Sequence, residues 1–178
     1  MAVVINGNGA VTGLTALPDS AMAEGSVIQV IQTSTTTQAS NNTVTFQDTN
    51  LSGTITPIST SSKILIYISQ QMFFTVNASG NGMGLNLLRG STIIHNAPRN
   101  SVGPYSDFIS GGNISSLNHH TYMNLHFIDS PSTTNATTYK TQFAVYEAAN
   151  SANSVVQVNA TPIDGKSYMT LMEVSAWI

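Results

Sequence analysis

The chain has 178 residues and a net charge of −3, and only 7% of its residues are charged, against about 25% in an average soluble domain. Its five basic residues are scattered along the chain, which argues against nucleic-acid binding. Cysteine is absent, which excludes disulfides and thiolate metal sites. No apolar run is long enough to span a bilayer, and no signal-peptide pattern opens the sequence, so we expect a protein made in the cytosol without membrane insertion.

The first 25 residues differ from the rest and are expected to form an extended N-terminal arm. Asn and Gly punctuate Met1–Gly25, and its apolar residues are too widely spaced for a core of their own. Pro18 opens a turn or helix signal, which predicts one helical turn over Ala21–Glu24. We expect the arm to become ordered against a partner, with packing on its own domain as the alternative. The candidate attachment residues are its apolar ones: Val3, Ile5, Val11, Leu14 and Leu17.

Residues 26–178 are expected to form a single β-domain around the stretch Ser61–Phe74. This stretch holds five consecutive apolar residues, Ile64–Ile68, between turn-forming flanks. A short apolar run of this kind is typical of a strand with both faces covered, although a buried helix carries similar runs. The Ser and Thr flanks and the lack of a 3.6-residue repeat favour the strand. We therefore predict the central strand of a sandwich here.

The strand pattern continues on both sides of this stretch. Gly90 predicts a tight turn or bulge. In the stretch around residue 125, alternation predicts that Met123, Leu125 and Phe127 share one face, with Tyr122, Asn124 and His126 on the other. The other predicted strands are Val27–Thr33, Thr43–Phe46, Leu51–Ile58, Gly84–His95, Thr121–Ile128, Thr138–Tyr146 (with Phe143 and Val145 inward), Val155–Val158 and Tyr168–Ile178.

These strands predict an all-β protein, an antiparallel β-sandwich. Their number and spacing favour a jelly roll. An immunoglobulin-like Greek key is the second choice, weakened by the missing Cys–Trp–Cys spacing.

The titratable residues predict no catalytic or metal site. His120 and His126 should share a strand face but lie about 20 Å apart, so we expect no zinc site within one chain. Three copies of one histidine meeting on a threefold axis are the alternative. No pair of carboxylates has the spacing that glycoside hydrolysis requires. We expect neither enzymatic activity nor a cofactor.

The long segment Asn96–Asn113 is the best candidate for surface recognition. It contains two prolines and three glycines, and loops of this length are often functional. Tyr105 and Phe108 lie there among Asn, Ser and Gly, a mixture that suits contacts with sugars or proteins. The alternative is that these two aromatic residues pack the loop onto the core. The candidate recognition residues are Tyr105, Phe108, Asn81 and Asn100.

Several phrases, in this order, resemble the C-terminal head domains of tailed-bacteriophage fibres and related virion proteins. They are LTALPDSAM, GSVIQV, TSSKILI, NLLRGSTII, FIDSPSTTNATTYK and YMTLMEVSA, and together they extend over most of Leu14–Ala176. The resemblance implies a jelly roll of the TNF/C1q type that forms homotrimers on virus particles. It also implies a location on the virion surface after synthesis in the host bacterial cytoplasm.

Two roles are consistent with this resemblance. The first is a structural one, in which a trimer is fixed by its arm to other virion proteins of the capsid or tail, as a head decoration or short fibre. The alternative is a tail-fibre receptor-binding protein whose loops recognise host surface glycans. Family members often follow a long shaft, whereas here only Met1–Gly25 precedes the domain, so we rank the structural role first.

Overall fold

The protein is all-β in the computed structural model, which describes residues 4–5, 11–12, 23–76, 83–96, 117–145, 155–159 and 165–175. Within these ranges it contains twelve strands and no helix. The strands are β1 (Val4–Ile5), β2 (Val11–Thr12), β3 (Val27–Thr35), β4 (Ala39–Asn41), β5 (Gln47–Ile55), β6 (Lys63–Val76), β7 (Met83–Arg89), β8 (Thr92–Asn96), β9 (Leu117–Asp129), β10 (Thr137–Val145), β11 (Val155–Val158) and β12 (Ser167–Val174).

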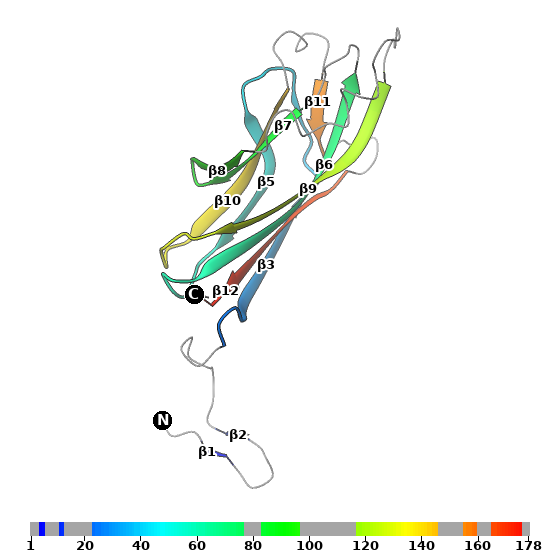
Figure 1. Cartoon of the computed structure of the whole chain (residues 1–178). Coiled ribbons are helices and arrows are strands. Elements are labelled where there is room, and N and C mark those ends of the chain that lie inside the picture. Colours follow the sequence, from blue (N-terminus) through cyan, green and yellow to red (C-terminus); the bar gives the residue numbers. More distant parts are fainter. Residues whose placement is uncertain are drawn as a thin grey trace.

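Two antiparallel sheets face each other and form a β-sandwich (Figure 1). The smaller sheet has the order β5-β10-β7-β8. The larger has the order β3-β12-β6-β11-β4, with β9 also paired to β6. Strands β12 and β11 pair with successive parts of β6, opposite residues 63–69 and 72–75. Strands β12 and β11 therefore lie one after the other along the same side of β6.

Eight strands of the sandwich pair in a nested order, first with last. The pairs are β3 with β12, β5 with β10, β6 with β9, and β7 with β8. This arrangement is that of a jelly roll, in which a folded-over antiparallel ribbon contributes alternate strand pairs to the two sheets. The predicted sandwich and its jelly-roll order are therefore confirmed.

Strand β6 is the central strand that the sequence predicts, but only one of its faces is fully covered. Ile64, Ile66 and Ile68 point into the sandwich and are at most 2% exposed. On the opposite face Leu65 is half-buried and Tyr67 is 40% exposed. The prediction of two covered faces was wrong because the second sheet packs against only one side of β6.

Two predicted segments need correction. Thr43–Phe46 is not a strand: Asn41 ends β4, and its side-chain oxygen accepts a hydrogen bond from the Thr43 amide at 2.8 Å. Such an Asx turn offers the backbone an alternative to a sheet ladder. Gly84–His95 is two strands, joined by a turn at Gly90, where φ is 59° and glycine is favoured. The predicted turn at Gly90 is confirmed.

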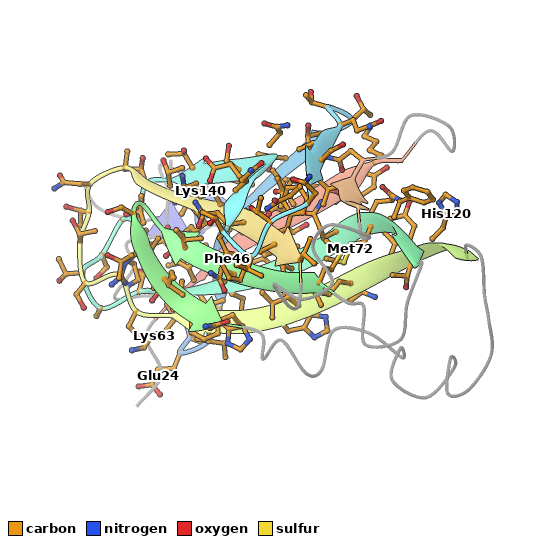
Figure 2. The ribbon with its side chains drawn as sticks, turned by 90° about the horizontal axis from the view of Figure 1, so that it is seen from above. Glu24, Phe46, Lys63, Met72, His120 and Lys140 are labelled. Carbon is orange, nitrogen blue, oxygen red and sulfur yellow. The ribbon has the colours of Figure 1, made fainter. Side chains whose placement is uncertain are left out.

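The interior consists of two apolar clusters with polar residues between them. One cluster contains Met72 and Phe143, and the other contains Ile68 and Tyr139. In the view of Figure 2, Met72 lies among the packed side chains, whereas Lys63 and His120 lie toward opposite ends of the molecule. The polar residues between the clusters, all fully buried, are Thr49, Gln70, Thr141, Asn159 and Ser167.

These five polar side chains, called the polar ring below, bond to one another in a closed circuit. Thr49 and Thr141 share a hydroxyl–hydroxyl bond, and the Thr141 hydroxyl donates to Gln70 Oε1 at 3.1 Å. Gln70 Nε2 donates to Ser167 Oγ at 2.7 Å, and that hydroxyl donates to Asn159 Oδ1. Asn159 Nδ2 closes the circuit on the Thr49 carbonyl at 3.2 Å. The polar ring thereby joins both sheets at the point along β6 where pairing with β12 ends and pairing with β11 begins.

The N-terminal arm lies largely outside the described residues. Strands β1 and β2 form a two-residue antiparallel ladder, with Ile5 opposite Val11. At the C-terminal end of the arm, Glu24 and Gly25 form a turn that the Ser26 amide closes on the Ala23 carbonyl at 3.0 Å. Ser175 Oγ also donates to that carbonyl, at 2.8 Å. The last residues of the arm are therefore bonded to the end of β12.

Candidate functional site: the outer face of the larger sheet

Most of the predicted site residues lie outside the described residues. This holds for all four candidate recognition residues in the loops, Tyr105, Phe108, Asn81 and Asn100. It also holds for three of the arm residues, Val3, Leu14 and Leu17, while Ile5 and Val11 are placed only by their backbone in β1 and β2. Within the described part of the chain, the candidate site is a surface that the sequence does not predict.

That surface is the outer face of the larger sheet, formed by alternate residues of β3, β12, β6 and β9. An apolar row crosses all four strands in register, from Val30 through Met172 and Leu65 to Ile128. Val30 and Ile128, at its two ends, are each 52% exposed. The outer face comprises Val30, Gln32, Ser34, Tyr168, Thr170, Met172, Lys63, Leu65, Tyr67, Ser69, Tyr122, Asn124, His126 and Ile128.

The predicted alternation along β9 is confirmed and explains this composition. Met123, Leu125 and Phe127 turn inward and pack against the two core clusters. Tyr122 and His126 turn outward with Asn124 and are exposed. His120 is exposed as well.

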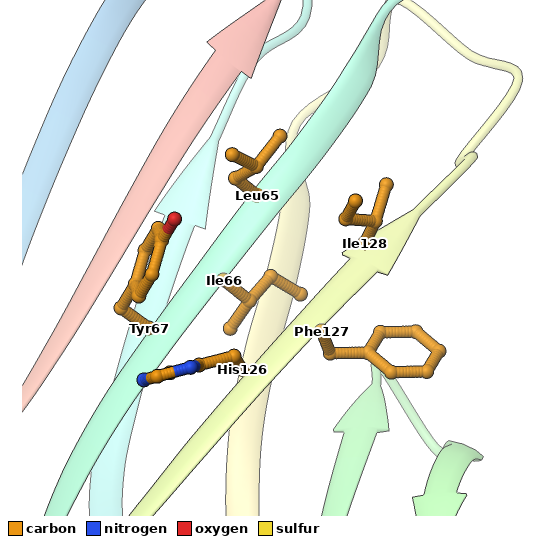
Figure 3. A pocket seen from close by; sticks show the side chains of 6 residues that line it. All are labelled: Leu65, Ile66, Tyr67, His126, Phe127 and Ile128. Carbon is orange, nitrogen blue, oxygen red and sulfur yellow. The ribbon is translucent and has the colours of Figure 1, made fainter.

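A shallow hollow of about 410 Å³ lies on the outer face beside the apolar row (Figure 3). The Tyr67 and His126 rings lie side by side there on neighbouring strands, 5.0 Å apart between centroids. A second such pair, Phe73 with His120, has a centroid distance of 4.6 Å. The residues that line the hollow are Leu65, Ile66, Tyr67, His126, Phe127 and Ile128.

The outer face carries little charge, and none of its residues is an acid. The two carboxylates nearest to the apolar row in sequence, Asp129 and Glu173, point into the sandwich and are buried. Glu173 accepts hydrogen bonds there from the Ile58 amide and the Gln29 side chain. A second copy of this face would therefore meet no like-charged carboxylates across a contact.

Asp129 is the centre of a partly buried ionic contact behind the outer face. Arg89 Nη1 donates to both carboxylate oxygens, at 3.0 and 2.9 Å, and the Tyr139 hydroxyl donates to Oδ2 at 2.7 Å. The contact ties together β7, β9 and β10. The sequence has no signal that would predict the two partners of Asp129, because they are 40 and 10 residues away.

Because its Tyr139 hydroxyl is buried, the folded protein should lose stability at alkaline pH. Burial raises the pKa of Tyr139 well above its ordinary value of 10.0, and the hydrogen bond to Asp129 and the charge of Asp129 raise it further. The unfolded chain therefore loses this proton first as the pH rises, so the stabilisation is complete below pH 10 and declines above it. Urea unfolding at pH 9 and 11 should show a shallower decline for Tyr139→Phe than for wild type.

A second pH interval provides the control for that experiment. Between pH 7 and pH 9, below the ordinary pKa of tyrosine, the stabilities of Tyr139→Phe and wild type should change in parallel. Equal declines of the two proteins between pH 9 and pH 11 would contradict a role for the buried Tyr139 hydroxyl.

A second, smaller hollow lies over β5 and β10, on the other sheet. It measures about 280 Å³ and includes the ion pair of Lys140 with Asp48, at 2.9 Å. Burial raises the pKa of Asp48, but hydrogen bonds from Lys140 and Gln142 and the charge of Lys140 outweigh it, so the net shift is downward. An exposed pair of this kind contributes little to stability.

The remaining site predictions concern metals and membranes. In the described residues, no cluster of three or more His, Asp or Glu side chains is placed to hold a metal ion. No helix among them has the length and apolar character needed to cross a membrane. Three carboxylates for which no catalytic pairing is expected lie outside the described residues: Asp107, Glu147 and Asp164.

Comparison with known proteins reveals no close relative. No family model matches the chain, and no curated protein does. Two solved structures of infectious bursal disease virus, that of the Gx strain and that of the VP2 subviral particle, are similar at TM-score 0.38 with 12% and 13% identity. The matches include 84% and 85% of this chain but only 37% and 38% of the viral chains.

A third similar structure, dimeric latent PorU from Porphyromonas gingivalis, has a TM-score of 0.34 and 9% identity, and the match includes 86% of this chain and 14% of PorU. Likeness at these levels carries no argument about function.

Proposed function

We propose that this protein is a non-enzymatic structural component of a tailed-phage virion, a homotrimer attached to the particle by Met1–Gly25. The outer face of the larger sheet is the surface through which its subunits meet. The ordered series of phrases that resemble phage fibre head domains supports the phage assignment and the threefold number. The observation that carries the proposal is the outer face itself.

The outer face has the properties of a contact between subunits. Its apolar row spans four strands, and three tyrosines, Tyr67, Tyr122 and Tyr168, are 39–51% exposed around it. Aromatic side chains are enriched at the centres of protein interfaces, where charged residues are depleted. A chain with only 7% charged residues has few other means of keeping such a face soluble.

The arm supplies attachment in this proposal. Deleting residues 1–22 retains Ala23–Ser26 and their bonds to Ser175, so the sandwich should stay intact. Three arms on one trimer would bind adjacent sites with a high effective concentration, so modest contacts would give tight attachment.

The test combines a mass measurement with a binding measurement. Light scattering of the full chain at low micromolar concentration and pH 7.5 should give three times the subunit mass of 18.8 kDa. The chain without residues 1–22 should have the same threefold mass but should no longer co-sediment with virus particles that lack the protein. A monomeric full chain would refute the trimer, and undiminished particle binding by the shortened trimer would refute the role of the arm.

A further inference from the structure

His126 lies on β9, at one side of the proposed contact, in the hollow of Figure 3. Its strand neighbour on β6 is Tyr67, and two residues along β9 is Ile128, at the end of the apolar row. The imidazole is exposed in the single subunit. Packing a second copy over the apolar row would remove it from water, because it belongs to the same hollow.

Among the described residues, no acidic side chain faces outward beside His126. The titratable groups facing outward with it are Lys63 and Tyr67 on β6, Tyr122 and His120 on β9, and Tyr168 on β12. Lys166, just before β12, lies 5.3 Å from the centre of the Tyr168 ring. On β3 the outward residues Val30, Gln32 and Ser34 are uncharged. A protonated imidazole therefore finds no carboxylate on its own outer face, nor on an identical face of a partner.

We infer that proton binding at His126 regulates self-association of the chain, so that subunits associate at neutral pH and dissociate in mild acid. This inference rests on the proposed function, because it requires the outer face to be the contact between subunits. The neutral imidazole is compatible with an apolar, acid-free interface. The imidazolium is not, since burying a charge without a partner is strongly unfavourable.

The expected effect is large because the contact repeats in every subunit. Histidine is the side chain that ordinarily gains a proton as the pH falls from 8 to 5. Excluding that proton on assembly weakens association about tenfold per subunit. A trimer with three such sites should therefore lose about a thousandfold in its formation constant between pH 7.5 and pH 5.5.

Sedimentation of the full chain across a concentration series at pH 7.5 and pH 5.5 tests the inference. Wild type should be trimeric at pH 7.5 and largely dissociated at pH 5.5 at the same micromolar concentration, with the sandwich still folded by circular dichroism. For His126→Gln and His126→Phe, the association constants at pH 7.5 and pH 5.5 should be nearly equal, whatever the strength of association of each variant at pH 7.5. His120→Gln, at the far end of β9, should behave like wild type.

The outcomes separate the inference from the proposed function. A monomer at pH 7.5 would refute the trimer itself. A wild-type trimer that persists unchanged at pH 5.5, or a His126→Gln trimer that still dissociates in acid, would overturn the inference and leave the proposed function standing. Dissociation at pH 5.5 that both His126 variants abolish would support it.

Discussion

Replacing Ile128 with lysine is expected to convert the proposed trimer into folded monomers. Ile128 ends the apolar row and is 52% exposed in the isolated subunit, so its side chain is available for contact with a partner. Only the exposed half of the side chain is left to bury, so losing that contact costs about 1 kcal/mol per subunit, or about 3 kcal/mol per trimer, which weakens association more than about a hundredfold. The unpaired lysine charge in an apolar contact weakens it further. Light scattering at 5 and 50 μM should give the subunit mass of 18.8 kDa at both concentrations.

The chain offers a closely matched control for this substitution. Ile93, on β8 of the smaller sheet, is 51% exposed, so Ile93→Lys introduces the same charge at an equally accessible isoleucine away from the outer face. That variant should remain trimeric. Lysine is well tolerated on edge strands, and both variants should keep the wild-type unfolding slope in urea. Dissociation of both variants, or of neither, would remove the outer face from its proposed role.

Most of the fold was predictable because it follows from local patterns. The five apolar residues Ile64–Ile68 identified the central strand, and alternation along β9 correctly assigned the two faces around Leu125. The error at Thr43–Phe46 has a local cause as well, since the Asn41 side chain bends backbone whose composition suits a strand. Patterns of this kind depend on neighbours within a few residues.

The outer face could not be recognised from the sequence, because it depends on which strands become neighbours. Val30, Leu65 and Ile128 are far apart in the chain and form one row only after β12 and β6 bring them into register. The apolar run in β6 predicted burial on both sides, and the half-exposed Leu65 and Tyr67 show that one side is open in the single subunit. The apolar run of β6 thus packs inside the sandwich on one face and, in our proposal, against another subunit on the other face.

The polar ring was equally inaccessible to sequence reasoning. The bonds of Gln70 to Thr141 and Ser167 join residues 71 and 97 positions apart. In the sequence, Gln70 is simply a polar residue after an apolar run, and no nearby residue indicates that it is fully buried. Its partners are supplied by the nested pairing of the strands.

Substituting Gln70 with leucine is expected to destabilise the fold by about 2–4 kcal/mol. Leucine has a similar size, so little cavity is created, and the cost comes from polar atoms that lose their partner in the dry interior. The Thr141 hydroxyl loses its acceptor, and Ser167 Oγ loses the 2.7 Å hydrogen bond from Gln70 Nε2. Urea unfolding at one fixed subunit concentration should report this loss, because stability of an oligomer depends on concentration.

A double-mutant cycle with Thr141→Val distinguishes a connected ring from a set of independent bonds. Thr141→Val alone should cost about 1–3 kcal/mol, since it leaves Gln70 Oε1 and the Thr49 hydroxyl without their partner. The double variant should cost at least about 1 kcal/mol less than the sum, because the bond between the two residues can be lost only once. Gln142→Leu, one position along β10, is the control: its amide donates to Asp48 at the surface, so its loss should stay within about 0.5 kcal/mol. Strict additivity of Gln70→Leu and Thr141→Val would show that the two sheets are not coupled through this ring, and that the apolar clusters on either side hold them together unaided.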